Sequence, residues 1–161
     1  MDRIYPGSLH NHTDYSNIRL RDCIIKVEDL IERAHCLIIA SDFKEGWAAV
    51  VNEGLASACP VLSSHSVGSC PVLIKDGKNG FAFELKNIKQ LSNYMKLIIK
   101  QENFFEYSRA AYDTTFNSFN AKIAANRFLE LVRLIKENKD TIYLDGPCSN
   151  SHVVKNNWIK K

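Results

Sequence analysis

The sequence has few glycines and prolines and no long apolar run. Its 161 residues include 7 Gly and 4 Pro, which excludes a collagen-like or low-complexity chain. The apolar run from Cys36 to Ala40 suits one buried strand, whereas a membrane-spanning helix needs about 18 apolar residues or more. Hydrophobic residues make up 45% and charged residues 24% of the chain, which predicts one globular domain.

The cysteine pattern lacks the pairs that disulfide scaffolds and zinc sites need. There are five cysteines, an odd number, and no two have the spacing Cys-x-x-Cys. Cys36 lies within an apolar run, where a free thiol behaves as a small hydrophobic group. The first residues also have no apolar stretch of signal-peptide length. These features favour a reduced, cytoplasmic protein without a structural metal.

Negative charge is scarce in the second half of the chain. The formal net charge is −3 over residues 1–85 and +6 over residues 86–161. A basic half can bind anionic lipid or nucleic acid, but solvated helix faces are the simpler explanation. No nucleic-acid-binding motif is present. We therefore expect no nucleic-acid partner, while peripheral contact with the inner face of a membrane stays open.

Short apolar segments alternate with helical patterns along the chain. The segments with strand character are 18–25, 36–40, 61–63 and 81–83. Apolar residues recur at helical spacing in 27–34, 48–57, 88–99, 104–112 and 121–138. Because strands buried in parallel sheets are apolar on both faces, the pattern predicts an α/β fold with a Rossmann-like parallel sheet and C-terminal helices. In the last helix, the residues expected to face inward are Ile123, Phe128, Leu131, Val132 and Ile135.

The segment after residues 36–40 combines a glycine, an aromatic residue and two carboxylates. Glu45, Gly46 and Trp47 precede a predicted helix, and Glu53 lies about a turn and a half inside it. A helix N-terminus has unpaired amide donors and a positive dipole, which suit a phosphate. Carboxylates on either side can accept hydrogen bonds from diols, as in a nucleotide-sugar. By spacing alone, surface carboxylates that stabilise the helix dipole are the simpler explanation.

A longer series of motifs reverses that preference. Glu45–Trp47 is followed by Glu53, with seven residues between the two glutamates, and then by Cys59–Ser64 and Val67–Phe81. In this order they are similar to the paired-glutamate motif, the next strand and the glycine-rich loop of one family. From Ser16 to about Ile135 the chain resembles the C-terminal, donor-binding domain of retaining nucleotide-sugar glycosyltransferases with the GT-B fold, the group 1 or family 4-like glycosyl transferases.

The resemblance implies a role for each matching residue. Glu45 would be catalytic, binding hydroxyls of the donor sugar on its reacting face. The backbone of Gly46 and Trp47 would contact sugar and phosphate, and Glu53 would bind the ribose diol. The pocket near the nucleotide would be lined by Val67, Gly68 and Ser69. Transfer in this family retains the sugar's configuration and requires no metal, so no cofactor is expected beside the nucleotide-sugar. The acceptor would be a glycan or a lipid-linked molecule, as in polysaccharide biosynthesis.

The resemblance covers only part of the family's domain and begins near its third strand. The first two strands, and the loop whose Arg and Lys clamp the diphosphate, have no counterpart, nor does the N-terminal acceptor domain. A doubly wound sheet places those two strands between the third and fourth, so residues 36–40 would form an exposed apolar edge. We expect the isolated chain to be slow or inactive, needing a separate N-terminal half or another copy of itself.

This comparison predicts three parts of the chain: an irregular segment at 1–15, a partial donor-binding domain at 16–138 and a polar, flexible tail at 139–161. Ala58 stands where the family often has glycine; a left-handed backbone there would cost alanine about 1–2 kcal/mol, so this helix end is expected to differ. His65 is interpreted as a solvated loop histidine and Trp158 as part of a frayed tail. The alternative function is a non-catalytic remnant or interaction module that keeps the fold without turnover.

Overall fold

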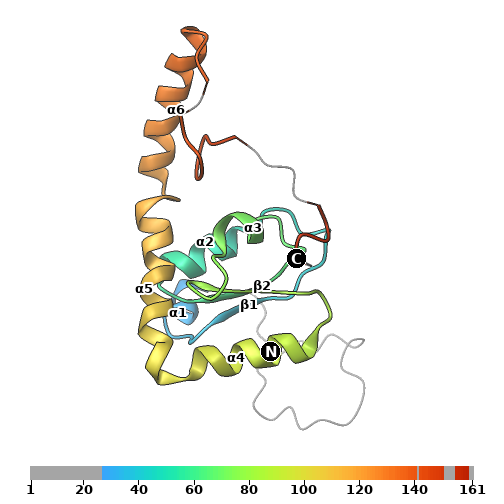
Figure 1. Ribbon diagram of the computed structural model, residues 1–161. Coiled ribbons are helices and arrows are strands. Elements are labelled where there is room, and N and C mark those ends of the chain that lie inside the picture. The colour runs from blue at the N-terminus through green and yellow to red at the C-terminus, as the bar shows by residue number, and fades with distance from the viewer. Residues whose placement is uncertain (1–26, 141, 151–154, 160–161) are drawn as a thin grey trace, which may run out of the picture.

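Three parallel strands form one sheet in the computed structural model, which describes residues 27–140, 142–150 and 155–159 (Figure 1). In the order β1-β2-β3, the strands span Leu37–Ile39, Val61–Ser64 and Gly80–Phe83. Both pairs of neighbouring strands are parallel, which confirms the α/β fold. The predicted strand at 18–25 and the irregular segment at 1–15 lie outside the described residues.

The outer strand β1 is the least buried of the three. All residues of β2 and β3 are buried. Among the described strands β1 has a neighbour on one side only, and its Ile38 is 37% exposed. The run at 36–40 is therefore a half-exposed edge strand rather than a fully buried one. The predicted strand at 18–25 is outside the described residues, so the exposed apolar edge of the whole sheet stays a prediction.

Helices cover both faces of the sheet (Figure 1). Their bounds are α1 Val27–Ile31, α2 Ala49–Ala56, α3 Cys70–Leu73, α4 Ile88–Ile99, α5 Gln101–Asn117 and α6 Ala121–Lys136. Successive strand residues point to opposite faces, so β2 contributes Val61 to one core and Leu62 to the other. The first core includes residues of α2 and α3, and the second includes Ile98 of α4. The result is a three-layer α/β/α arrangement.

Helix α2 packs close to the sheet and ends in a left-handed residue. A Cβ atom at Gly54 would lie 2.7 Å from Leu37 Cδ2, so glycine permits this close approach. Ala58 has φ 56°; its amide donates to Leu55 O and the Cys59 amide donates to Gly54 O. These two bonds form a Schellman motif. The helix end thus keeps the left-handed conformation despite alanine, contrary to the expectation that it would differ.

Helix α6 extends away from the sheet beyond the end of α5 (Figure 1). Of its predicted inward residues, Phe128 is 58% and Ile135 is 62% exposed, whereas Leu134 is buried. The prediction is therefore wrong for Phe128 and Ile135, whereas Ile123, Leu131 and Val132 are half-buried. On α6, Arg127 instead donates to carbonyl oxygens of the returning chain at Asp145 and Pro147. Because α6 extends beyond the sheet, its apolar residues have no sheet face to pack against (Figure 1).

Candidate functional site

The loops that follow β1 and β2 meet at one edge of the sheet. Carboxyl ends of parallel strands lie on the same side, and here the Gly68 amide donates to the Gly46 carbonyl over 2.9 Å. A Cβ atom at Gly68 would lie 2.6 Å from that carbonyl oxygen. The contact therefore requires glycine at 68. It brings together two of the predicted site segments, Glu45–Trp47 and Val67–Ser69.

The loop before α2 presents its backbone to solvent. Asp42 holds the loop, because its carbonyl accepts from the Glu45 amide at 3.1 Å and its carboxylate accepts from the Lys44 amide at 2.9 Å. Glu45 and Gly46 are exposed, and a Cβ atom at Gly46 would meet nothing within 4 Å. The space above Gly46 is therefore open to a ligand.

Trp47 lies half-exposed beside the start of α2. Its indole Nε1 donates to Asn52 Oδ1 over 2.8 Å, which ties the loop to the first turns of the helix. The ring also lines a cavity of about 340 Å³ together with His65, Val67 and Gly68. Trp47 thus forms a wall of this cavity and keeps 47% of its surface exposed.

The N-terminus of α2 has unsatisfied amide donors. Ala48 precedes the helix with φ 58° and ψ 76°, a left-handed conformation, and its side chain provides no cap. The amides of Ala49 and Val50 have no acceptor among the residues described. Helix dipole and free amides together favour an anion at this position. The strained residue Ala48 is the kind of backbone feature that often accompanies a functional loop.

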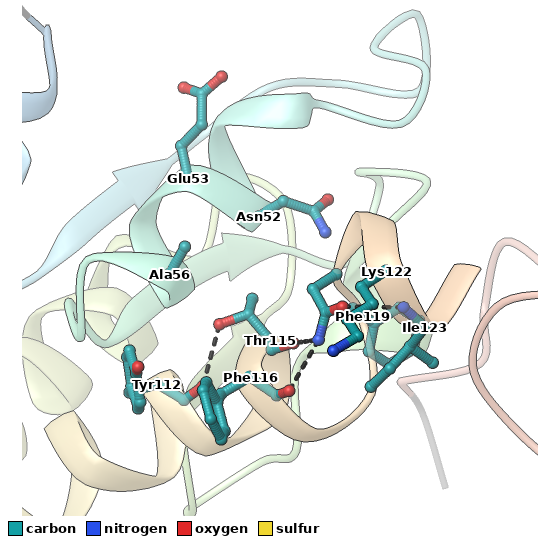
Figure 2. A pocket seen from close by; sticks show the side chains of 10 residues that line it. Asn52, Glu53, Ala56, Tyr112, Thr115, Phe116, Phe119, Lys122 and Ile123 are labelled. Atoms are coloured by element: carbon teal, nitrogen blue, oxygen red, sulfur yellow. Dashed lines mark hydrogen bonds between the residues drawn. The ribbon is translucent and has the colours of Figure 1, made fainter. Parts of the chain in front are cut away.

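The second predicted carboxylate, Glu53, lies on another side of α2. It is exposed and borders a separate groove of about 760 Å³ between α2 and the α5–α6 junction. Figure 2 shows its carboxylate directed away from the aromatic residues Tyr112 and Phe116. Glu45 borders neither this groove nor the cavity beside Trp47. Neither of these two cavities among the described residues is therefore lined by both Glu45 and Glu53.

The segment Val67–Ser69 is mostly buried. Val67 and Ser69 are 1% and 0% exposed; Val67 lines the cavity beside Trp47, but Ser69 does not. The hydroxyls of Ser66 and Ser69 are buried and have no hydrogen-bond partner in the described part of the chain. Ser66 lines the cavity. A buried hydroxyl without a partner is costly, so Ser66 is a candidate to bind a ligand.

Two parts of this cavity were not assigned to the site from sequence. His65 is buried rather than solvated, and its Nδ1 accepts from the Leu85 amide at 3.1 Å. The segment 155–158 contributes Lys155, Asn156 and Trp158 to the lining. The predicted flexible tail thus contains a packed segment. A local pattern could not indicate this contact, because Trp158 and its partner His65 are 93 residues apart.

Among the described residues, no group of three or more His, Cys, Asp or Glu side chains is arranged to hold a metal ion. None of the helices in the described ranges has the length and apolar character that crossing a bilayer requires.

Comparisons with known proteins identify the same family that the motifs resemble. The family model described as glycosyl transferases group 1 matches residues 25–114. Among solved structures, the chain is similar to the C-terminal domain of a glycosyl transferase group 1 family protein (LpcC) from Francisella tularensis, with a TM-score of 0.56 and 22% identity. The match covers 65% of this chain and 53% of that one, so the chain spans about half of that domain. No curated protein matches the chain.

Proposed function

The chain belongs to the group 1 family of glycosyl transferases, and from this premise we propose that it is the donor-binding part of a retaining glycosyltransferase. It would bind a nucleotide-diphospho-sugar and contribute to transfer of the sugar to a glycan or a lipid-linked acceptor. A separate N-terminal half, or another copy of the chain, would complete the enzyme. The edge position of β1 among the described strands, with Ile38 exposed, supports the need for such a partner.

The observation that carries this proposal is the hydrogen bond between Gly68 and Gly46. It holds the loops after β1 and β2 together at the sheet edge where ligands of parallel α/β sheets bind. Close to it along the chain are an uncrowded Gly46 backbone and the amides of Ala49 and Val50, which have no acceptor among the described residues. These features offer a diphosphate hydrogen-bond donors at close range.

The proposed chemistry uses charge stabilisation rather than a metal. As the bond between sugar and diphosphate breaks, negative charge grows on the departing diphosphate. Amides already aimed at that position stabilise the charge without reorganising. Glu45, on the exposed loop, would bind sugar hydroxyls, and Glu53 would bind the ribose diol. The two carboxylates would then contact opposite ends of one extended ligand, which does not require them to share a cavity.

A thermal-shift titration of the purified chain tests this function. UDP, GDP, ADP and their sugars are added separately, and at 100 times the dissociation constant binding should stabilise the chain by about 2.7 kcal/mol. The Glu53→Ala variant should lose the shift. The control variant Glu32→Ala removes another exposed carboxylate, directly after α1, and should keep the nucleotide-induced thermal shift.

The possible outcomes separate the two candidate functions. A shift with one nucleotide that disappears in Glu53→Ala supports the donor site. A cooperative transition with no shift for any nucleotide contradicts it and favours the non-catalytic interaction module. A shift that survives in Glu53→Ala would refute the assigned role of Glu53.

A further inference from the structure

The segment 155–159 is anchored to the carboxyl end of β2. Trp158 Nε1 donates to the His65 carbonyl over 3.0 Å. Trp158 and Ile159 also pack against the core that includes Val51 and Leu55 of α2. The Trp158 indole is half-buried, and an aromatic ring with its N–H satisfied can anchor a segment. This end of the tail is therefore part of the wall around the cavity beside Trp47.

The charge in this cavity comes from the tail. Among the described residues that line the cavity, Lys155 carries the formal positive charge, and none is an Asp or Glu. The other polar groups are neutral: the Asn156 amide, the Ser66 hydroxyl and His65, whose Nδ1 is occupied by the Leu85 amide. Gly68 cannot offer its amide, which is bonded to Gly46. A ligand that uses these groups would be an anion.

The Ser66 hydroxyl is a second polar group at a residue that lines this cavity. Ser66 is 6% exposed, and its Oγ has no partner in the described part of the chain. It lines the same cavity as Lys155. Hydroxyl and ammonium groups can both donate to phosphate oxygens.

We propose that Lys155 is a phosphate-binding residue of the donor site, positioned by Trp158, and that it supplies positive charge to the diphosphate of the nucleotide-sugar. This inference rests on the proposed function. The charge would come from a segment far along the chain from the strands that form the site. Lys155 contacts the ligand, whereas Trp158 acts through the segment that it holds.

Calorimetric titrations with nucleoside diphosphates and with inorganic pyrophosphate test the role of Lys155. Lys155→Gln should weaken nucleoside diphosphate binding about tenfold, in line with the loss of one charged hydrogen bond, and should flatten its salt dependence. Lys155→Arg should restore most of the affinity. Lys89→Gln removes an exposed lysine on α4 and should change neither quantity.

The Trp158→Phe variant tests the positioning role. This variant keeps an aromatic ring but removes the hydrogen bond to the His65 carbonyl, so its affinity for the nucleoside diphosphate should fall. Adding Lys155→Gln to this variant should then have less effect than it has in the wild-type chain. Full additivity of the two substitutions would contradict the coupling between anchor and lysine.

The outcomes distinguish this inference from the proposed function. If the wild-type chain binds a nucleotide and Lys155→Gln binds it equally well, the inference fails and the donor site stands. If the chain binds pyrophosphate through Lys155 but no nucleotide, the anion site stands and the donor function fails. Binding of neither ligand by the wild-type chain refutes both.

Discussion

The Gly68 amide donates to the Gly46 carbonyl, and this bond joins the loops that follow two neighbouring strands. The two residues differ in what a side chain would meet. At Gly68 a Cβ atom would lie 2.6 Å from the Gly46 carbonyl oxygen, whereas at Gly46 it would meet nothing within 4 Å. One glycine is therefore needed for packing between loops, and the other leaves space for a ligand.

Alanine at each glycine should separate these roles. Gly68→Ala should lower the free energy of unfolding by about 1–3 kcal/mol, because backbone must shift to relieve the overlap. Gly46→Ala should leave stability within about 0.5 kcal/mol and weaken only nucleotide binding. Urea denaturation of both variants measures the first effect. Equal loss of stability in the two variants would contradict the difference in crowding.

Glycine at position 58 should stabilise the chain. Ala58 has a left-handed φ of 56°, so Ala58→Gly should raise the free energy of unfolding by about 0.5–1 kcal/mol. Ala125→Gly is the matched control within α6 and should lower it by about as much. Thermal and urea denaturation give both values. If both substitutions destabilise, the left-handed helix end is not present in solution.

The apolar stripe of α6 should contribute unevenly to stability. Leu134 is 5% exposed and Phe128 is 58% exposed. Leu134→Ala should lower the free energy of unfolding by about 2 kcal/mol or more, whereas Phe128→Ala should change it by about 0.5 kcal/mol or less. A decrease in the free energy of unfolding of Phe128→Ala as large as that of Leu134→Ala would show that the Phe128 side chain is buried in solution.

Buried thiols should make the folded chain less stable in alkali. Burial raises the pKa of Cys59 and of Cys70 to about 11, from an ordinary value of 9.0. Above about pH 9 the unfolded chain loses these protons while the folded chain keeps them, so the free energy of unfolding decreases up to about pH 11. Urea denaturation over this range should show a smaller decrease in a Cys59→Ala/Cys70→Ala double variant. If the free energy of unfolding falls with pH equally in the wild-type chain and in the double variant, the two buried thiols are not the cause of the decrease.

Local patterns predicted most of the elements near the site. The apolar segments at 36–40, 61–63 and 81–83 correspond to β1, β2 and β3, and the helix predicted at 88–99 is α4. Strand and helix formation depends on the spacing of apolar residues over a few turns, which is readable along the chain. The order of motifs likewise indicated the family.

The sequence by itself therefore determined the α/β class, the family and the segments that come before and after each strand. Tertiary structure alone decided that Gly68 bonds to Gly46, that Phe128 and Ile135 of α6 stay exposed, and that Lys155 and Trp158 border the cavity. Periodicity shows that a face is apolar but does not identify what covers it. Contacts between residues as distant as Trp158 and His65 arise from the path of the whole chain, so no local pattern encodes them.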